Sequence, residues 1–237
     1  MSGVWPIVRL TAVALLLFSS GTLVSRTAVA EEQICDAKAD FALGREDYAT
    51  AIKFHREILE SQPNNALAHY HLGFAYAMTG RSPEEVNEYL AAARLGLRNW
   101  DLFLNLGLAY LGLHELRLAA DAFATAESLA PSHPEPHVNL ALVYESEGRL
   151  SEALDEITFA RRLAPADPDA ANTNAIICVE MGNTARARNI WARLSEVAPD
   201  YAPARANLSI LNCSSAHDGL SLSSAGHPLC TVGHPFR

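Results

Sequence analysis

The chain has 237 residues, 49% hydrophobic and 19% charged, so it can bury a core and is not a disordered polyelectrolyte. Its formal net charge is −9 at pH 7. Because contacts with DNA, RNA or anionic lipid need clustered Lys and Arg, this acidity argues against nucleic acid or a lipid surface as the main partner.

Residues 1–30 have the three-part layout of a secretory signal peptide. Arg9 precedes an apolar stretch, Leu10–Phe18, and the small residues Ala28 and Ala30 form an A-x-A cleavage site. The uncharged stretch runs from Leu10 to Ser25. This stretch is shorter than the roughly 20 residues that span a bilayer. We therefore predict a periplasmic or secreted protein cleaved after Ala30. The alternative is an uncleaved, inner-membrane anchored segment.

From residue 32 onward the chain repeats with a period of 34 residues. The repeated features are a small residue (Gly73, Gly107, Ala141 and Ala175), then an aromatic residue or Cys (Tyr76, Tyr110, Tyr144 and Cys178), then Gly or His (Gly80, His114, Gly148 and Gly182), and Pro at the end (Pro63, Pro131, Pro165 and Pro199). Apolar residues at three- and four-residue steps predict amphipathic helices, with Gly ending the first helix of each unit and Pro ending the second. Such helix pairs bury their apolar faces by stacking.

This pattern resembles the tetratricopeptide repeat (TPR), whose unit reads W-x2-L-G-x2-Y followed by G, A, F, A and P at fixed offsets, and specifically its exported bacterial type. The resemblance covers residues 32–213 and implies an all-α fold, a right-handed superhelical solenoid of antiparallel helix pairs. We expect five repeats (32–65, 66–99, 100–133, 134–167 and 168–201), a C-terminal capping helix at 202–213, and a disordered tail at 214–237, where periodicity is lost.

Two residues depart from the repeat pattern. Glu85 occupies a position that is Ala in the other units, which predicts a looser or shifted helix interface. Leu97 stands where the other units have Pro, so the helix that ends near Gly96 is expected to lead differently into Trp100.

Four cysteines lie at Cys35, Cys178, Cys213 and Cys230, without the C-x-x-C spacing of zinc or thioredoxin sites. In an oxidising compartment three full pairings are open, of which Cys213 with Cys230 closes the shortest loop. Cys178 takes the Tyr position of its repeat, so we expect it to be buried and unpaired.

The resemblance implies a concave groove lined by the first helix of each unit. One row of that groove is His71, Asn105, Asn139, Thr173 and Asn207, spaced at 34 residues. An Asn amide can pair with both N–H and C=O of an extended peptide, as in related superhelical members of the family. The alternative is that Asn is simply frequent at this position and touches no ligand.

Other groove positions are apolar or acidic. They are Tyr70, Phe74, Met78, Leu104, Leu108, Val138, Leu142 and Ile176, and the acids Asp101, Glu135, Glu145, Asp169 and Glu180. Because none is Lys or Arg, the clamp that holds a terminal carboxylate in some family members is missing, and an extended apolar segment flanked by basic residues fits better. The alternative is that the apolar residues belong to the core and the acids to a solvated surface.

Catalytic, cofactor and metal-binding patterns are missing from the sequence, so we predict no enzyme, no cofactor and no metal site. His69 and His71 are two residues apart on a helix and point to different faces. His133 and His137 flank a predicted turn, Pro134–Pro136, where histidines are mostly ordinary surface residues.

The sequence therefore indicates an exported protein–protein interaction scaffold that binds an extended peptide or partner protein, with envelope complex assembly as its setting. One alternative is a regulatory or targeting subunit that presents a substrate to a separate enzyme. Another is a metal-handling protein that uses the tail residues His217, His227 and His234 with Cys213 and Cys230. We expect no nucleic acid partner. We expect contact with a membrane only through an uncleaved signal segment. The oligomeric state stays open.

Overall fold

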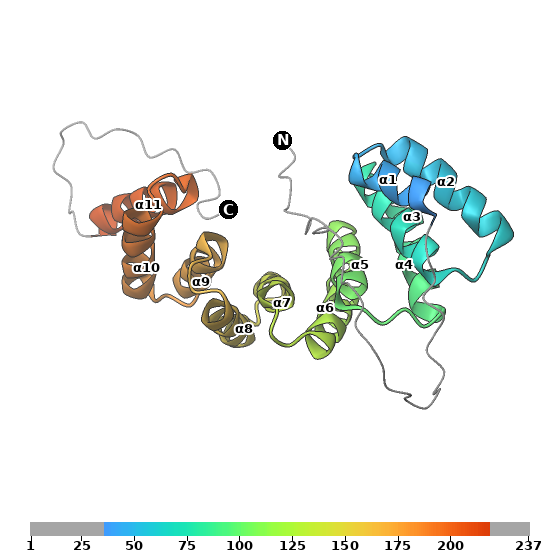
Figure 1. Ribbon diagram of the computed structural model, residues 1–237. Coiled ribbons are helices and arrows are strands. Elements are labelled where there is room, and N and C mark those ends of the chain that lie inside the picture. Colours follow the sequence, from blue (N-terminus) through green and yellow to red (C-terminus); the bar gives the residue numbers. More distant parts are fainter. Residues whose placement is uncertain (1–35, 219–237) are drawn as a thin grey trace, which may run out of the picture. The chain divides into compact units, whose positions relative to one another are not determined.

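The computed structural model describes residues 36–218, and every regular element in that range is an α-helix (Figure 1). The helices are α1 (Ala37–Gly44), α2 (Tyr48–Ser61), α3 (Ala66–Met78), α4 (Ser82–Arg94), α5 (Trp100–Gly112), α6 (Leu116–Leu129), α7 (Pro134–Ser146), α8 (Leu150–Leu163), α9 (Pro168–Glu180), α10 (Thr184–Val197) and α11 (Ala202–Asp218). These bounds place two helices in each predicted repeat. The predicted signal peptide at 1–30, Cys35 and Cys230 lie outside the described residues. Among the described helices, none is both long and apolar enough for a membrane span.

Local backbone chemistry explains where the first helix of each pair begins and ends. The side chains of Asn65 and Asn99 accept hydrogen bonds from backbone N–H groups in the first turns of α3 and α5. At the other end the chain adopts positive φ at Gly80, Gly148 and Gly182, as predicted. Non-glycine residues take the same conformation at Glu46 and His114, both with φ 61°. The turn is therefore part of the repeat even where Gly is absent.

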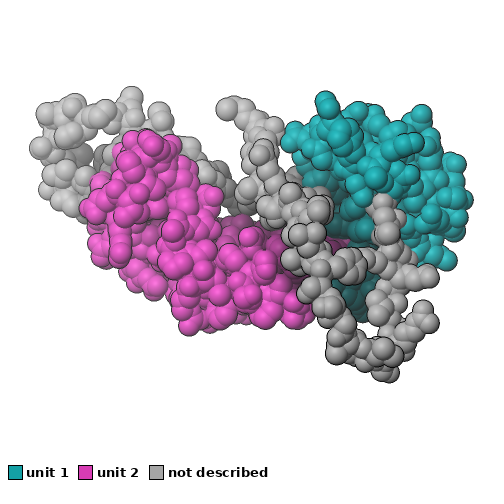
Figure 2. Space-filling view, viewed as in Figure 1, with its two compact units in different colours: residues 1–98 teal, residues 99–237 magenta. Residues whose placement is uncertain are grey.

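The chain divides into two compact units, residues 1–98 and residues 99–237 (Figure 2). In the described part of unit 1, α1 packs on α2, α2 on α3 and α3 on α4. In unit 2 each helix from α5 to α11 packs on the next. The first helices also contact one another, α5 with α7 and α7 with α9. Stacked antiparallel helix pairs confirm the predicted all-α solenoid of repeats.

The boundary between the units coincides with the repeat that lacks its terminal proline. In the other repeats the second helix ends at a non-helical residue such as Ala130, with φ −143° and ψ 69°, which a Pro follows. α4 instead ends through Gly96 at φ 93°, with the N–H of Leu97 bonded to the C=O of Ala92. The expected difference at Leu97 is therefore a glycine-terminated helix in place of a proline turn.

Close contacts between the two helices of a pair form the core. A Cβ atom at Gly73 would lie 2.7 Å from the ring of Tyr89, and one at Gly107 would lie 2.5 Å from the ring of Phe123. The backbone O of Glu85 would lie 3.3 Å from the same Cβ at Gly73, so α3 and α4 approach closely and the expected loosening is not found.

Two further predictions concern the C-terminal repeats. Cys178 is buried and free, as expected, because it fills a core position beside Trp191. α11 continues to Asp218 instead of ending at Cys213. The first helix-breaking residue after Cys213 is Gly219, so the local sequence permits this extension. The rest of the predicted tail lies outside the described residues.

Candidate functional site

Two polar rows run across the first helices of unit 2. The first is the predicted row of Asn105 on α5, Asn139 on α7, Thr173 on α9 and Asn207 on α11. The second contains Asp101, Glu135 and Asp169, each four residues earlier on the same helix. Residues four apart share a helix face, so a carboxylate row lies one turn from the amide row.

The members of the amide row differ in how far they are accessible. Asn105 and Asn207 are buried, whereas Asn139 and Thr173 are half-buried. The side-chain N–H of Asn207 donates to Oδ1 of Asn172 at 3.0 Å, and the indole N–H of Trp191 donates to the same oxygen at 2.8 Å. Asn207 therefore ties α11 to α9. The amide of Asn139 donates to the backbone O of Glu135 at 2.8 Å, which leaves its carbonyl oxygen and second N–H outside that bond.

The carboxylates of Asp101 and Glu135 are poorly satisfied within the described part of the chain. Oδ1 of Asp101 and Oε2 of Glu135 are buried and have no hydrogen-bond partner there, although Nδ1 of His133 lies 3.7 Å from Oε2 of Glu135. Burial raises the pKa of Asp101, the positive charge of His133 opposes this, and the charge of Glu135 adds to it. Asp169 is different, because the Tyr201 hydroxyl donates to it at 2.7 Å. The Asp101–Glu135 pair is thus suited to accept hydrogen bonds from a cationic side chain.

Several predicted apolar groove residues are core residues. Tyr70 and Leu104 have exposed fractions of 3% and 1%, and Phe74 is also buried, because they pack between helices. Met78 is exposed, and Val138 is half-buried against the core of its own repeat. Apart from Met78, these positions therefore contribute mainly to packing. Glu145 is half-buried near the end of α7.

His71 lies in unit 1 and has a different environment from the other members of its row. Its Nδ1 is 2.9 Å from Oδ1 of Asp40, and its ring lies edge-on to that of His55, with 5.3 Å between ring centroids. His55 is completely buried, and this burial, together with the charge of His71, lowers the pKa of His55 to about 4. Asp40 and His55 are not among the residues predicted for a site from the sequence. A signal was present, because both stand where the following repeat has aromatic residues, Phe74 and Tyr89.

Two further histidines, His69 and His137, form links between helices. His69 Nδ1 lies 2.5 Å from Glu88, and His137 Nδ1 lies 2.8 Å from Glu156. His137 is buried in α7, so its expected place beside a surface turn is wrong. Pro134 and Pro136 stand in the first turn of that helix, which tolerates Pro, and do not form a turn outside it.

Comparisons with known proteins agree with this architecture. The sequence profile of the tetratricopeptide repeat family matches residues 37–99 and 104–171. A comparison with curated proteins found no match. Among solved structures, the chain is similar to MamA, with a TM-score of 0.67 and 21% identity over 71% of this chain and 99% of that chain. The MamA of Desulfovibrio magneticus RS-1 gives a TM-score of 0.65 and 17% identity over 69% of this chain and 92% of that chain.

A further similar structure is YrrB, described as a TPR protein with an unusual peptide-binding site. Its TM-score is 0.64 and its identity is 22%, over 76% of this chain and 88% of that chain. At such identities the likeness to solved structures establishes the fold. The family profile covers more than half of the sequence, and the protein therefore belongs to the tetratricopeptide repeat family.

Proposed function

We propose that this protein is an interaction scaffold that holds an extended apolar segment with basic flanks, part of a partner protein, on the first helices of unit 2. Membership of the tetratricopeptide repeat family supports the scaffold role, because such repeats bind protein or peptide partners and are generally not enzymes. The printed description of YrrB as having a peptide-binding site supports a peptide as the form of the ligand.

The observation that carries this proposal is the carboxylate pair of Asp101 and Glu135. Acids near a helix N-terminus also interact favourably with the helix dipole, but that role does not require buried oxygens without hydrogen-bond partners. A Lys or Arg side chain of a bound segment would satisfy both carboxylates and offset their burial. Basic flanks on the partner follow from this requirement.

One turn along the same helices, Asn139 and Thr173 would bind the backbone of the segment. Both are partly accessible, and both carry donor and acceptor groups. Since α7 and α9 contact each other, the two side chains belong to neighbouring helices of one packed unit. We infer that the amide contact is concentrated on these two residues, with Asn105 and Asn207 supporting the helices.

A peptide panel with a matched charge control tests this function. The panel contains extended apolar peptides flanked either by Lys or by Glu. We expect the Lys-flanked peptides to bind and to weaken with added salt. The variant Asp101→Asn, Glu135→Gln, Asp169→Asn should bind them at least about tenfold more weakly, since hydrogen bonds to charged groups contribute about 1.5–3 kcal/mol.

The control variant is Asp121→Asn, Asp155→Asn, Glu196→Gln. It removes the same charge from exposed acids on the second helices of the same unit and should bind like the wild type. Equal loss of binding in both variants would mean that overall charge, and not this site, attracts the peptide.

We also propose that the protein works outside the cytoplasm, where it would take part in envelope complex assembly. The support is the signal-peptide pattern of residues 1–30. Sequencing the N-terminus of the protein isolated from its own cells should show Glu31 as the first residue. Crosslinked pull-down from the same cell envelope should then identify the partner. A protein that retains Met1 and fractionates with the cytoplasm would contradict export.

A further inference from the structure

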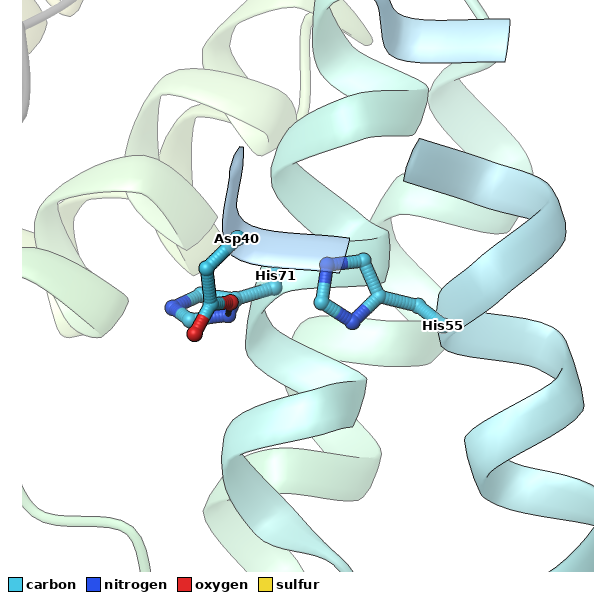
Figure 3. Close-up of side chains that lie close together, drawn as sticks. All are labelled: Asp40, His55 and His71. Carbon is cyan, nitrogen blue, oxygen red and sulfur yellow. Dashed lines mark ion pairs between the residues drawn. The ribbon is translucent and has the colours of Figure 1, made fainter. Parts of the chain in front are cut away.

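Three side chains of unit 1 converge from three different helices (Figure 3). They are Asp40 on α1, His55 on α2 and His71 on α3. Each offers one nitrogen or oxygen atom, and these three atoms lie within 4.8 Å of one another. Side chains of these kinds at this spacing can coordinate a metal ion.

The repeat register shows that all three residues are departures from the pattern of this chain. At the position of Asp40 the later repeats have Phe74, Leu108, Leu142 and Ile176, and at the position of His55 they have Tyr89, Phe123, Ile157 and Trp191. Burying an apolar side chain contributes about 1.5–3 kcal/mol, whereas a buried polar group costs stability unless it is satisfied. At the fully buried position of His55, packing alone would therefore favour an apolar residue. The three departures occur in positions that the fold brings together.

A second group in unit 2 has an explanation that needs no metal. Glu127, His137 and Glu156 also lie within 4.8 Å of one another. However, the contact of His137 with Glu156 has a counterpart in His69 with Glu88, two repeats earlier at the same register. A hydrogen-bonded His–Glu link between the two helices of a pair is thus a recurring feature of this chain.

We propose that Asp40, His55 and His71 bind a divalent transition-metal ion, with zinc as the occupant. Two imidazole nitrogens, one carboxylate oxygen and one water complete a tetrahedral zinc site. Ligand atoms of such a site are about 3.4 Å apart, given metal–ligand bonds of about 2.1 Å. Because Asp40 and His71 already approach to 2.9 Å, and all three atoms lie within 4.8 Å, small side-chain movements suffice.

The surroundings allow an ion to enter. The Asp40 side chain is 41% exposed and that of His71 is 13% exposed, while His55 forms the buried wall of the site. A metal would coordinate the facing atoms of His71 and Asp40, which lie 2.9 Å apart. It would also join α1, whose length is only eight residues, to α2 and α3, so that metal binding stabilises the first helix pair by mass action.

The test compares the full chain with a variant that restores the repeat pattern. Asp40→Leu, His55→Phe, His71→Asn installs the residues of the third repeat, Leu108, Phe123 and Asn105. With Zn²⁺ in calorimetry and Co²⁺ in visible absorption as probes, we expect the wild type to bind one equivalent more than this variant. Zinc should raise the Tm of the wild type through this site, and this rise should be lost in the variant.

The matched control is His137→Phe, Glu156→Ala, which installs Phe103 and Ala122 of the third repeat and should retain the additional equivalent. Metal binding by the His and Cys residues near the C-terminus contributes equally to all three proteins, so the difference isolates the site. Equal stoichiometry in the wild type and the triple variant would overturn the proposal.

A single substitution keeps the test decisive if the triple variant does not fold. Asp40→Asn preserves the shape of a partly exposed side chain and removes its charge. We expect it to leave the circular dichroism spectrum unchanged and to weaken zinc binding by at least about tenfold. Unchanged zinc affinity in this variant would equally overturn the proposal.

Discussion

Unit 1 and unit 2 share one repeat register but fill it with different chemistry. The buried position in the middle of each second helix holds His55 and Tyr89 in unit 1, and Phe123, Ile157 and Trp191 in unit 2. All five side chains are fully buried. A related contrast occurs at the position that holds Ala51 and Glu85 in unit 1 and only alanines in unit 2. Position in the repeat therefore sets whether a side chain is buried, and residue type sets what that burial costs or permits.

Among the substitutions that test this comparison, Gly73→Ala is expected to change stability the most. Ala141 fills the equivalent position in unit 2, but a Cβ at Gly73 would meet the Tyr89 ring at 2.7 Å. We expect Gly73→Ala to lower the free energy of unfolding by about 3 kcal/mol, measured by urea denaturation, because overpacking forces the ring or helix to move. Adding Tyr89→Ile, which copies the Ala141–Ile157 pair, should recover most of this loss. If Gly73→Ala left the free energy of unfolding unchanged, the contact with the Tyr89 ring would not be tight.

A second substitution pair separates the accessible from the buried members of the amide row. Asn139→Ala with Thr173→Ala should weaken binding of the Lys-flanked peptide by about 2 kcal/mol, measured by calorimetry, since backbone groups of the peptide lose partners. His71→Asn, in unit 1, should leave peptide binding unchanged. Asn207→Ala should mainly reduce stability, because it breaks the hydrogen bond to Asn172. Unchanged affinity of the double variant would move the binding surface away from α7 and α9.

The buried carboxyl group of Glu85 predicts that stability depends on pH. Unit 2 has alanines at the equivalent position and lacks this dependence. Burial raises the pKa of Glu85 to about 7 from an ordinary value of 4.5, so the folded protein holds this proton more tightly than the unfolded chain. Its contribution to stability is therefore fully present below pH 4.5 and is lost as the pH rises through about 7. Glu85→Ala should raise the free energy of unfolding at pH 8 by about 1–2 kcal/mol and change it much less at pH 4.5.

The control for Glu85 lies in the same turn of the helix. Glu84 has a lowered pKa because Arg81 donates hydrogen bonds to it, so Glu84→Ala should bring no gain at pH 8. If Glu85→Ala changed stability equally at both pH values, ionisation of the buried carboxyl would not be the cause.

The smallest effect concerns the left-handed turns that lack glycine, Glu46 in unit 1 and His114 in unit 2. Glu46 and His114 adopt φ 61° without being Gly, which costs an L-residue about 1–2 kcal/mol. Part of that cost is recovered by the lower backbone entropy of a non-glycine residue in the unfolded chain. Glu46→Gly and His114→Gly should therefore each raise stability by up to about 1 kcal/mol, visible as a higher Tm. Gly148→Ala is the reverse control and should lower it.

Helix positions and burial differ in how well the sequence predicts them. The limits of the ten helices from α1 to α10 follow local chemistry: capping side chains such as Asn65, positive φ at Gly80, and Pro at Pro131. Within the predicted groove, the spacing of Asn139 and Thr173 was readable, but the burial of Tyr70 and Leu104 was not. A first helix contacts both its own partner and neighbouring pairs, so helical spacing alone does not separate a core face from a ligand-facing one.

The sequence by itself determined the repeat, its period and the ends of its helices, because these depend on interactions between residues a few positions apart. Only the tertiary structure decided that Asp40, His55 and His71 meet, and that one oxygen each of Asp101 and Glu135 is buried without a hydrogen-bond partner. Those arrangements depend on how three helices, or two first helices of successive repeats, pack against each other. Such packing distances between separate helices are set by all the side chains in the interface together.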